Sequence, residues 1–145
     1  MNARLRALQA LIRLRKMDLD EARSRLSYAM AQETAAQQEV QRLRTEMQRE
    51  REQLDVSPAS AEAFRNWLPL AENILEKACQ DLHDAHLVSQ QAGAFVVHAK
   101  AALQAAEKLL EKQQEQEKIE ADRRTQAEMD DLSARCRSAF LELGP

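Results

Sequence analysis

The stretch QQAGAFVVHAKAALQAAEKLL, residues 90–110, has an alanine at every seventh position and a larger apolar residue four positions after each alanine. The repeat begins near residue 68, and only Ser89 interrupts it. Its members are Ala71, Ala78, Ala85, Ala92, Ala99 and Ala106 with Leu68, Leu75, Leu82, Val96, Leu103 and Leu110. Such a repeat predicts a helix packed along its length, and the alanines predict a close approach of the partner helix. Five residues just before the large positions should widen this seam: Trp67, Ile74, Val88, Phe95 and Leu109.

A second seven-residue repeat precedes the first, in residues 5–54; its large positions fail only at Glu33, and its companion positions fail at Arg15 and Glu50. Its large members are Leu5, Ile12, Leu19, Leu26, Val40, Met47 and Leu54, and its companion positions hold Leu8, Ala22, Ala29, Ala36 and Leu43. Neither helix can bury its apolar face alone. We therefore predict an all-α fold, a long antiparallel two-helix coiled-coil hairpin.

The segment LDVSPASAEAFRNWLP, residues 54–69, holds two of the three prolines and breaks both repeats, so it should form the tip of the hairpin. Ser57 can cap a helix that starts at Pro58, and Asn66 can cap again with Pro69 in a first turn. We expect one architectural unit over residues 1–145, with helix one at about 3–55, the tip at about 56–66 and helix two at about 67–143.

The second helix should be the longer one and should overhang at its C-terminal end. If residues 55 and 66 face each other at the tip, residues beyond about 119 have no partner in the chain. Apolar spacing resumes beyond that point, at Met129, Leu132, Cys136, Phe140 and Leu143, before Gly144 and Pro145 end the helix. An exposed apolar stripe of this kind needs another surface to cover it.

Composition argues against an enzyme. The chain is 44% hydrophobic and 31% charged but only 3% aromatic, with two glycines, which is typical of long helices. A two-helix hairpin has little room for a sheltered active site.

The charge is distributed asymmetrically along the chain: residues 1–25 carry seven basic and three acidic side chains (+4), and residues 111–131 carry four basic and eight acidic ones (−4). Antiparallel folding would lay part of these stretches side by side.

The chemistry-bearing residues are sparse. His83 and His86 give a single H-x-x-H pair, fewer than the four ligands of a structural metal site, and no phosphate-binding glycine motif occurs. Cys79 and Cys136 would lie more than about 80 Å apart on a straight helix, so we expect reduced thiols. We expect no catalytic site, metal or cofactor.

The basic, amphipathic N-terminus could be a membrane-surface helix or a transit peptide, but it continues in phase into the first seam. No apolar run approaches the roughly 20 residues that span a bilayer. We expect a cytoplasmic protein without stable membrane insertion. Nucleic-acid binding has only the N-terminal arginines in its favour, so none is expected.

Two apolar features remain at the open end of the predicted hairpin. Leu11 and Leu14 lie outside the seam positions, which makes the first turns apolar around more of their circumference than one partner helix can cover. The C-terminal stripe is the second feature. Together they are the best candidates for a docking surface.

The sequence resembles the FliJ/YscO family of small type III secretion proteins of bacterial flagella and injectisomes. The resemblance rests on LQALIRLRKMDLDEA (Leu8 to Ala22), NWLPLAENILEKA (Asn66 to Ala78) and DRRTQAEMDDLSAR (Asp122 to Arg135), together with the length and the tip position. It implies a stalk-like coiled coil that inserts into the export ATPase hexamer, promotes its assembly, and touches the export gate protein and escort chaperones near the tip.

By position, the resemblance implies ATPase-binding residues Leu8, Leu11, Leu14, Met129, Leu132 and Phe140, and gate- or chaperone-binding residues Leu43, Leu75 and Ala78. The chain departs from the family at Glu46, Glu50 and Ala71, where members can carry aromatic residues. We therefore expect a non-enzymatic stalk or adaptor, peripheral at the inner-membrane secretion apparatus. The alternative is a generic coiled-coil scaffold or holdase-type chaperone, and the flagellar and injectisome systems are both open.

Overall fold

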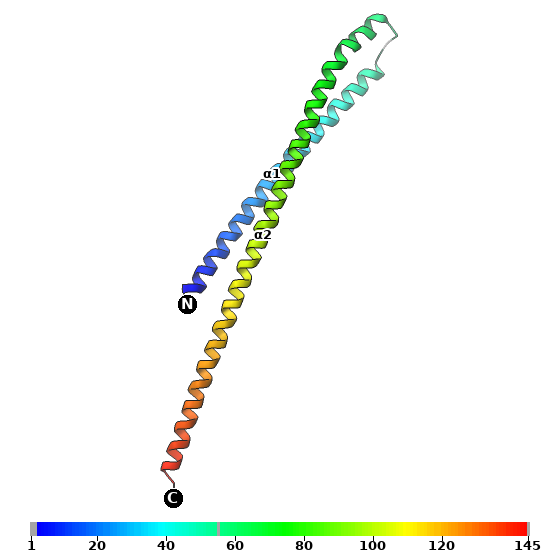
Figure 1. Cartoon of the computed structure of the whole chain (residues 1–145). Coiled ribbons are helices and arrows are strands. Elements are labelled where there is room, and N and C mark those ends of the chain that lie inside the picture. Colours follow the sequence, from blue (N-terminus) through cyan, green and yellow to red (C-terminus); the bar gives the residue numbers. More distant parts are fainter. Residues whose placement is uncertain (1–2, 55, 145) are drawn as a thin grey trace. The chain divides into compact units, whose positions relative to one another are not determined.

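The computed structural model describes residues 3–54 and 56–144 and consists of two long helices (Figure 1). Helix α1 is Ala3–Glu52 and helix α2 is Pro58–Glu142. Both are rich in Ala, Leu, Glu, Gln, Lys and Arg, the residues with the highest helix propensity. The described residues contain no strand. The prediction of an all-α helical hairpin with a longer second helix is confirmed.

The chain divides into two compact units, and each helix contributes to both. The tip unit is Met17–Lys100, and the terminal unit combines Met1–Lys16 with Ala101–Pro145. The expectation of a single architectural unit over residues 1–145 stays a prediction, and residues 1, 2, 55 and 145 lie outside the described part of the chain.

In the tip unit, the two predicted seams form the core. Val40 and Leu43 of α1 make a buried cluster with Ala78 of α2, and Leu75, Cys79 and Leu82 pack against it. The other buried residues of this unit are Leu19, Ala22, Ala29, Met47 and Ala92. Nearly all of these residues occupy predicted seam positions. Half of the buried residues are alanines, which are small enough to let the two helix backbones approach closely.

The predicted widening of the second seam is wrong at four positions. Ile74, Val88, Phe95 and Leu109 are each more than half exposed. A single partner helix covers a narrow arc, so side chains one position beyond the seam remain in contact with solvent. Leu54 is also exposed because α1 ends before it. Trp67 is half-buried beside Phe64, with the ring centroids 5.8 Å apart.

The tip is shorter than predicted. Helix α1 ends at Glu52, three residues before the expected end, and α2 begins at Pro58 rather than near 67. Ser57 caps α2 as predicted, since its Oγ accepts a hydrogen bond from the Ser60 amide at 3.2 Å. With the helix already started there, Asn66 is an interior residue. Pro69 fits because its fixed φ is helical, although its ring nitrogen cannot donate to the preceding turn.

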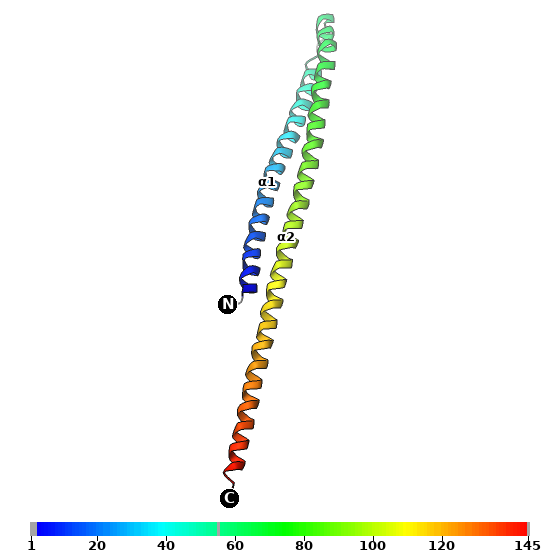
Figure 2. The same cartoon turned by 60° about the vertical axis from the view of Figure 1, so that its left-hand side comes forward.

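The terminal unit contains the end of the seam. Ile12 is buried, Ala106 is only 2% exposed, and Leu5 and Leu8 are half-buried. Partial burial along α2 ends at Glu117, and residues 118–143 are all exposed. In this unit α2 continues well past the start of α1, as the ribbon shows (Figure 2). The unpaired segment was expected beyond about residue 119, so the register was predicted to within a few residues.

Helix α2 ends as its sequence predicts. The Gly144 amide donates to the Leu141 carbonyl at 3.3 Å, which closes a final turn after Glu142. Neither helix, over its described residues, is long and apolar enough to cross a membrane.

Candidate docking surface

The first apolar patch lies at the start of α1, in the terminal unit. Leu8 and Leu11 are half-buried, whereas Leu14 is 50% exposed. Ile12, between them, points into the seam and is buried. The expectation that Leu11 and Leu14 lie outside the seam therefore fits Leu14 fully and Leu11 in part. We call these three leucines the N-terminal patch.

The second patch is the C-terminal stripe of α2, defined by Met129, Leu132, Cys136, Phe140 and Leu143. All five residues are exposed. Both charge signs flank the stripe, and Arg135 pairs with Asp131 one turn away at 3.2 Å. Exposed pairs of this kind add little to stability. The stripe is therefore helical, accessible and uncovered within its own unit.

The two patches do not form one continuous surface. Eleven helical residues lie between Glu117, where partial burial ends, and Met129, so these two residues are about 18 Å apart along the helix. Ile119 is the one large apolar side chain in that interval. A partner that contacts both patches must therefore span a charged stretch of α2.

The tip-side residues Leu43, Leu75 and Ala78 are placed together, but in the core. Leu43 and Ala78 are buried, and Leu75 packs against them. Their role in the structure is to hold α1 against α2. A partner on this face would meet the exposed neighbours of these residues instead.

A groove in the tip unit was missed by sequence reasoning. It has a volume of about 490 Å³ and is lined by Ser24, Arg25, Tyr28, Ala29, Val88, Gln91, Ala92 and Phe95. Tyr28, Val88 and Phe95 are each more than half exposed. The sequence did give one sign of this groove, because Val88 and Phe95 lie at the margin of the predicted seam. An apolar side chain at the margin of a seven-residue repeat can be exposed or buried.

The interruptions of the two repeats face each other across the hairpin. Glu33 interrupts the first repeat and Ser89 the second, and the Glu33 carboxylate makes hydrogen bonds with both Ser89 and His86. The distance from Glu33 Oε1 to His86 Nδ1 is 2.6 Å. The hydrogen bond with His86, followed by that with Ser89, lowers the pKa of Glu33. A polar contact thus replaces an apolar layer of the seam.

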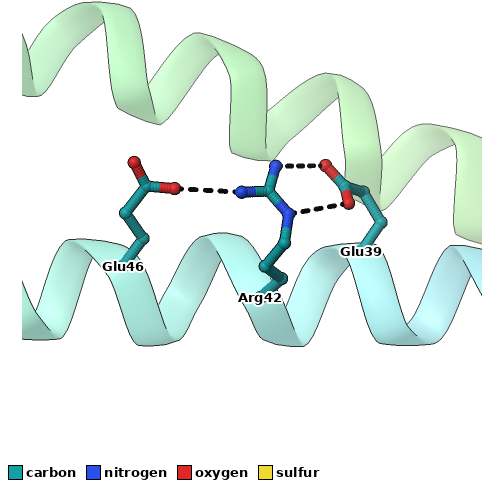
Figure 3. A network of polar contacts seen from close by, with 3 residues as sticks. All are labelled: Glu39, Arg42 and Glu46. Carbon is teal, nitrogen blue, oxygen red and sulfur yellow. Dashed lines mark hydrogen bonds and ion pairs between the residues drawn. The ribbon is translucent and has the colours of Figure 1, made fainter.

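A second polar cluster lies on α1, where Arg42 is held between Glu39 and Glu46 (Figure 3). Arg42 Nη2 and Nε donate to the two Glu39 oxygens at 2.7 and 3.0 Å, and Nη1 donates to Glu46 at 3.2 Å. This two-pronged contact lowers the pKa of Glu39. Glu46, one of the departures from the family pattern, therefore has a partner on its own helix.

The described residues contain no group of three or more His, Cys, Asp or Glu side chains that could hold a metal ion. Cys79 is a free, half-buried thiol packed against the tip-unit core, and Cys136 is a free thiol on the exposed stripe.

A hairpin of two long helices with exposed apolar side chains in both units belongs to the class of helical coiled-coil proteins. A comparison with family models identifies the family. The model described as Flagellar FliJ protein matches residues 4–139, so the chain belongs to the FliJ family. No curated protein and no solved structure gave a match. The family is a non-catalytic part of the flagellar export apparatus, and this chain is a protein-transport component of that apparatus.

Proposed function

We propose that this chain is a non-enzymatic stalk or adaptor that binds the export ATPase ring through its terminal unit and promotes assembly and activity of the ring. The observation that carries the proposal is the run of exposed helix at residues 118–143, which bears an apolar stripe, in a member of the FliJ family. Helix-in-groove docking uses such a face and concentrates its energy in a few apolar anchors.

Within this proposal, the anchors are Leu8, Leu11 and Leu14 of the N-terminal patch and Met129, Leu132 and Phe140 of the stripe. Leu14 is the most exposed of the three N-terminal leucines, so it can contact a partner without disturbing the seam. The protein would act on the cytoplasmic side, peripheral to the inner-membrane secretion apparatus, as family membership suggests.

Contacts with the export gate protein and escort chaperones are also part of the proposal. Because Leu43 and Ala78 are buried, these contacts would use exposed side chains around them in the tip unit. Tyr28, Val88 and Phe95, which line the groove, are the apolar candidates there.

Substitution of Leu14 tests ATPase docking. Leu14→Asp should leave helicity and Tm nearly unchanged but weaken capture of the purified ATPase by at least about 2 kcal/mol, roughly thirtyfold, as loss of an interface anchor does. Leu87→Asp is the matched control, because Leu87 is also 50% exposed but lies in the tip unit. Titration calorimetry and ATP turnover measure both variants.

Stoichiometry separates the proposal from the alternative of a generic scaffold or holdase. About one chain per ATPase hexamer supports a stalk. The stalk proposal would be contradicted by several chains per hexamer or by no affinity for the ATPase. The assigned docking surface would be contradicted by equal losses of ATPase capture in the Leu14 and Leu87 variants.

A further inference from the structure

The exposed segment at residues 118–143 presents a face that is distinct from the intrachain seam. In the terminal unit, the partly or fully buried positions of α2 are Ala106, Leu110, Gln113 and Glu117, besides Ala102 and Leu103. At the same spacing the seam would continue at Glu120, Arg124, Ala127 and Asp131, which are mostly charged and all exposed. The stripe begins at Met129 with a different phase. The stripe therefore lies on a different face of α2 from the hairpin seam and is not a continuation of that seam.

The stripe follows its own seven-residue repeat. Met129, Cys136 and Leu143 are seven residues apart, and Leu132 and Ala139 take the companion positions three residues after the first two. This is the a/d pattern of a helix that pairs with another helix. The segment is uncovered within its own unit, so this face is available to a second helix.

We propose that a second copy of this chain covers the stripe, with residues 118–143 of the two copies paired antiparallel. The register places Met129 of one copy opposite Leu132 of the second copy. Two symmetric Met129–Leu132 layers then form the centre of the contact. Cys136 faces Thr125 of the second copy in the next layer outward, and Ala139 faces Asp122 beyond it. Contacts that are apolar in the middle and polar outside predict a weak, reversible dimer.

Charge and apolar residues beside the stripe agree with this register. In an antiparallel pair, like flanking positions face each other, which brings Glu128 opposite Arg135 of the second copy, twice by symmetry. On the other flank Ile119 faces Phe140 of the second copy, so the isolated Ile119 gains an apolar partner. A parallel pairing would instead put Asp122 against Asp122 and Arg135 beside Phe140. The charge pattern therefore favours the antiparallel arrangement.

The length of the exposed segment fits the same register. Lys118 falls opposite Leu143 of the second copy, so the contact begins at the first residue of the exposed segment and ends one residue beyond α2. The whole unpaired segment is used, and no residue of the intrachain seam is needed. This inference concerns the isolated chain and does not depend on binding of the ATPase.

Concentration-dependent mass in solution tests the dimer. Sedimentation equilibrium should show a monomer–dimer equilibrium with a Kd on the order of 10 μM, the range of a small apolar interface. Leu132→Glu should weaken it at least tenfold. Leu141→Glu is the matched control, because Leu141 is an exposed leucine on the same segment but outside the stripe, and it should leave the equilibrium unchanged. Circular dichroism checks that both variants remain helical.

Charge exchange and cross-linking test the register. Glu128→Arg and Arg135→Glu should each weaken the dimer, and the double variant should restore it, because the exchange recreates the facing pair. In a Cys79→Ser background, Thr125→Cys should form a covalent dimer with Cys136 of the second copy on mild oxidation. Without the Thr125 substitution no covalent dimer should form, because two Cys136 residues would be separated by about 16 Å along the antiparallel axis.

Several outcomes would overturn the proposal. A strictly monomeric chain at tenfold the expected Kd excludes the dimer. Equal losses in the Leu132 and Leu141 variants exclude the stripe as the interface. A covalent dimer through Cys136 alone would show parallel pairing. ATPase capture is measured separately with Leu14→Asp, so failure of one proposal leaves the other to be judged on its own data.

Discussion

Single residues explain why both repeats are interrupted without breaking the hairpin. Glu33 and Ser89 look like unrelated defects in the sequence, but they lie at one level of the tip unit, where the Glu33 carboxylate makes hydrogen bonds with both Ser89 and His86. A carboxylate in a seam is costly unless it has partners. Here two side chains from α2 supply them, and the side chains remain close enough to solvent to be hydrated.

The Glu33 contact predicts a pH dependence of stability. Its pKa is lowered in the folded state from the ordinary 4.5, so its contribution is fully present above pH 4.5 and is lost as the pH falls through the lowered value. Glu33→Gln should therefore have a lower Tm than the natural protein at pH 6, and the difference should shrink below pH 4.5. The effect should be modest because His86 is half exposed.

Thermal unfolding followed by circular dichroism between pH 3 and pH 6 measures this difference. Glu72→Gln is the control, because it removes an exposed carboxylate on α2 that takes no part in the Glu33 contact, and its Tm difference from the natural protein should not change in this way with pH. A Tm difference that stayed constant over the whole range would contradict an ionised Glu33 as the source of the stability.

At the scale of the helix, the same residue type has opposite roles depending on its face. Ala105 is exposed and Ala106 is 2% exposed, although the two are adjacent on α2. Alanine at Ala106 allows α2 to approach the first turns of α1 within the terminal unit. At Ala105 it does no more than favour the helix.

Enlarging these two alanines should separate packing from propensity. Ala106→Leu should destabilise the protein by about 1–3 kcal/mol, because extra methylene groups force the two helices apart. Ala105→Leu should change stability by less than about 0.5 kcal/mol, as surface substitutions do. Urea unfolding measures both variants, and a similar loss in the two would show that α2 is rotated from the described seam.

At the scale of the whole chain, stability and binding are assigned to different residues. Every buried apolar residue lies between Ile12 and Ala106, and the described part of the chain beyond Glu117 contains none. The C-terminal segment therefore adds helix without adding to the core, while it carries the stripe on which both proposed contacts depend. Of the acidic stretch at residues 111–131, only the part up to Glu117 lies in the paired portion of the terminal unit, which also contains the basic start of α1.

Deletion of residues 118–145 tests this division. The truncated chain should lose helical signal in proportion to the residues removed but keep a Tm within about 2 °C of the full chain, because no buried contact is lost. It should also lose dimerisation and most ATPase capture. Calorimetry and sedimentation measure these properties, and a large fall in Tm would show that the segment contributes to the fold of the chain.

The sequence by itself determined the two helices, the turn between them, the cap at Ser57 and the point beyond which α2 has no partner. These features depend on local periodicity and on chain length, and both are properties of the amino-acid sequence alone. The family followed as well, because the quoted segments and their spacing carry the resemblance that the family match over residues 4–139 confirms.

Only the tertiary structure decided which apolar residues are covered. Leu43 and Ala78 became core, Val88 and Phe95 were left beside a groove, and the N-terminal patch and the stripe were kept apart. It also brought Glu33 to His86, residues that are far apart in the chain. The physical reason is that burial and pairing depend on how one helix face is turned toward the other. A repeat fixes the existence of that face but leaves its width and its cross-helix partners to the packing of the two helices.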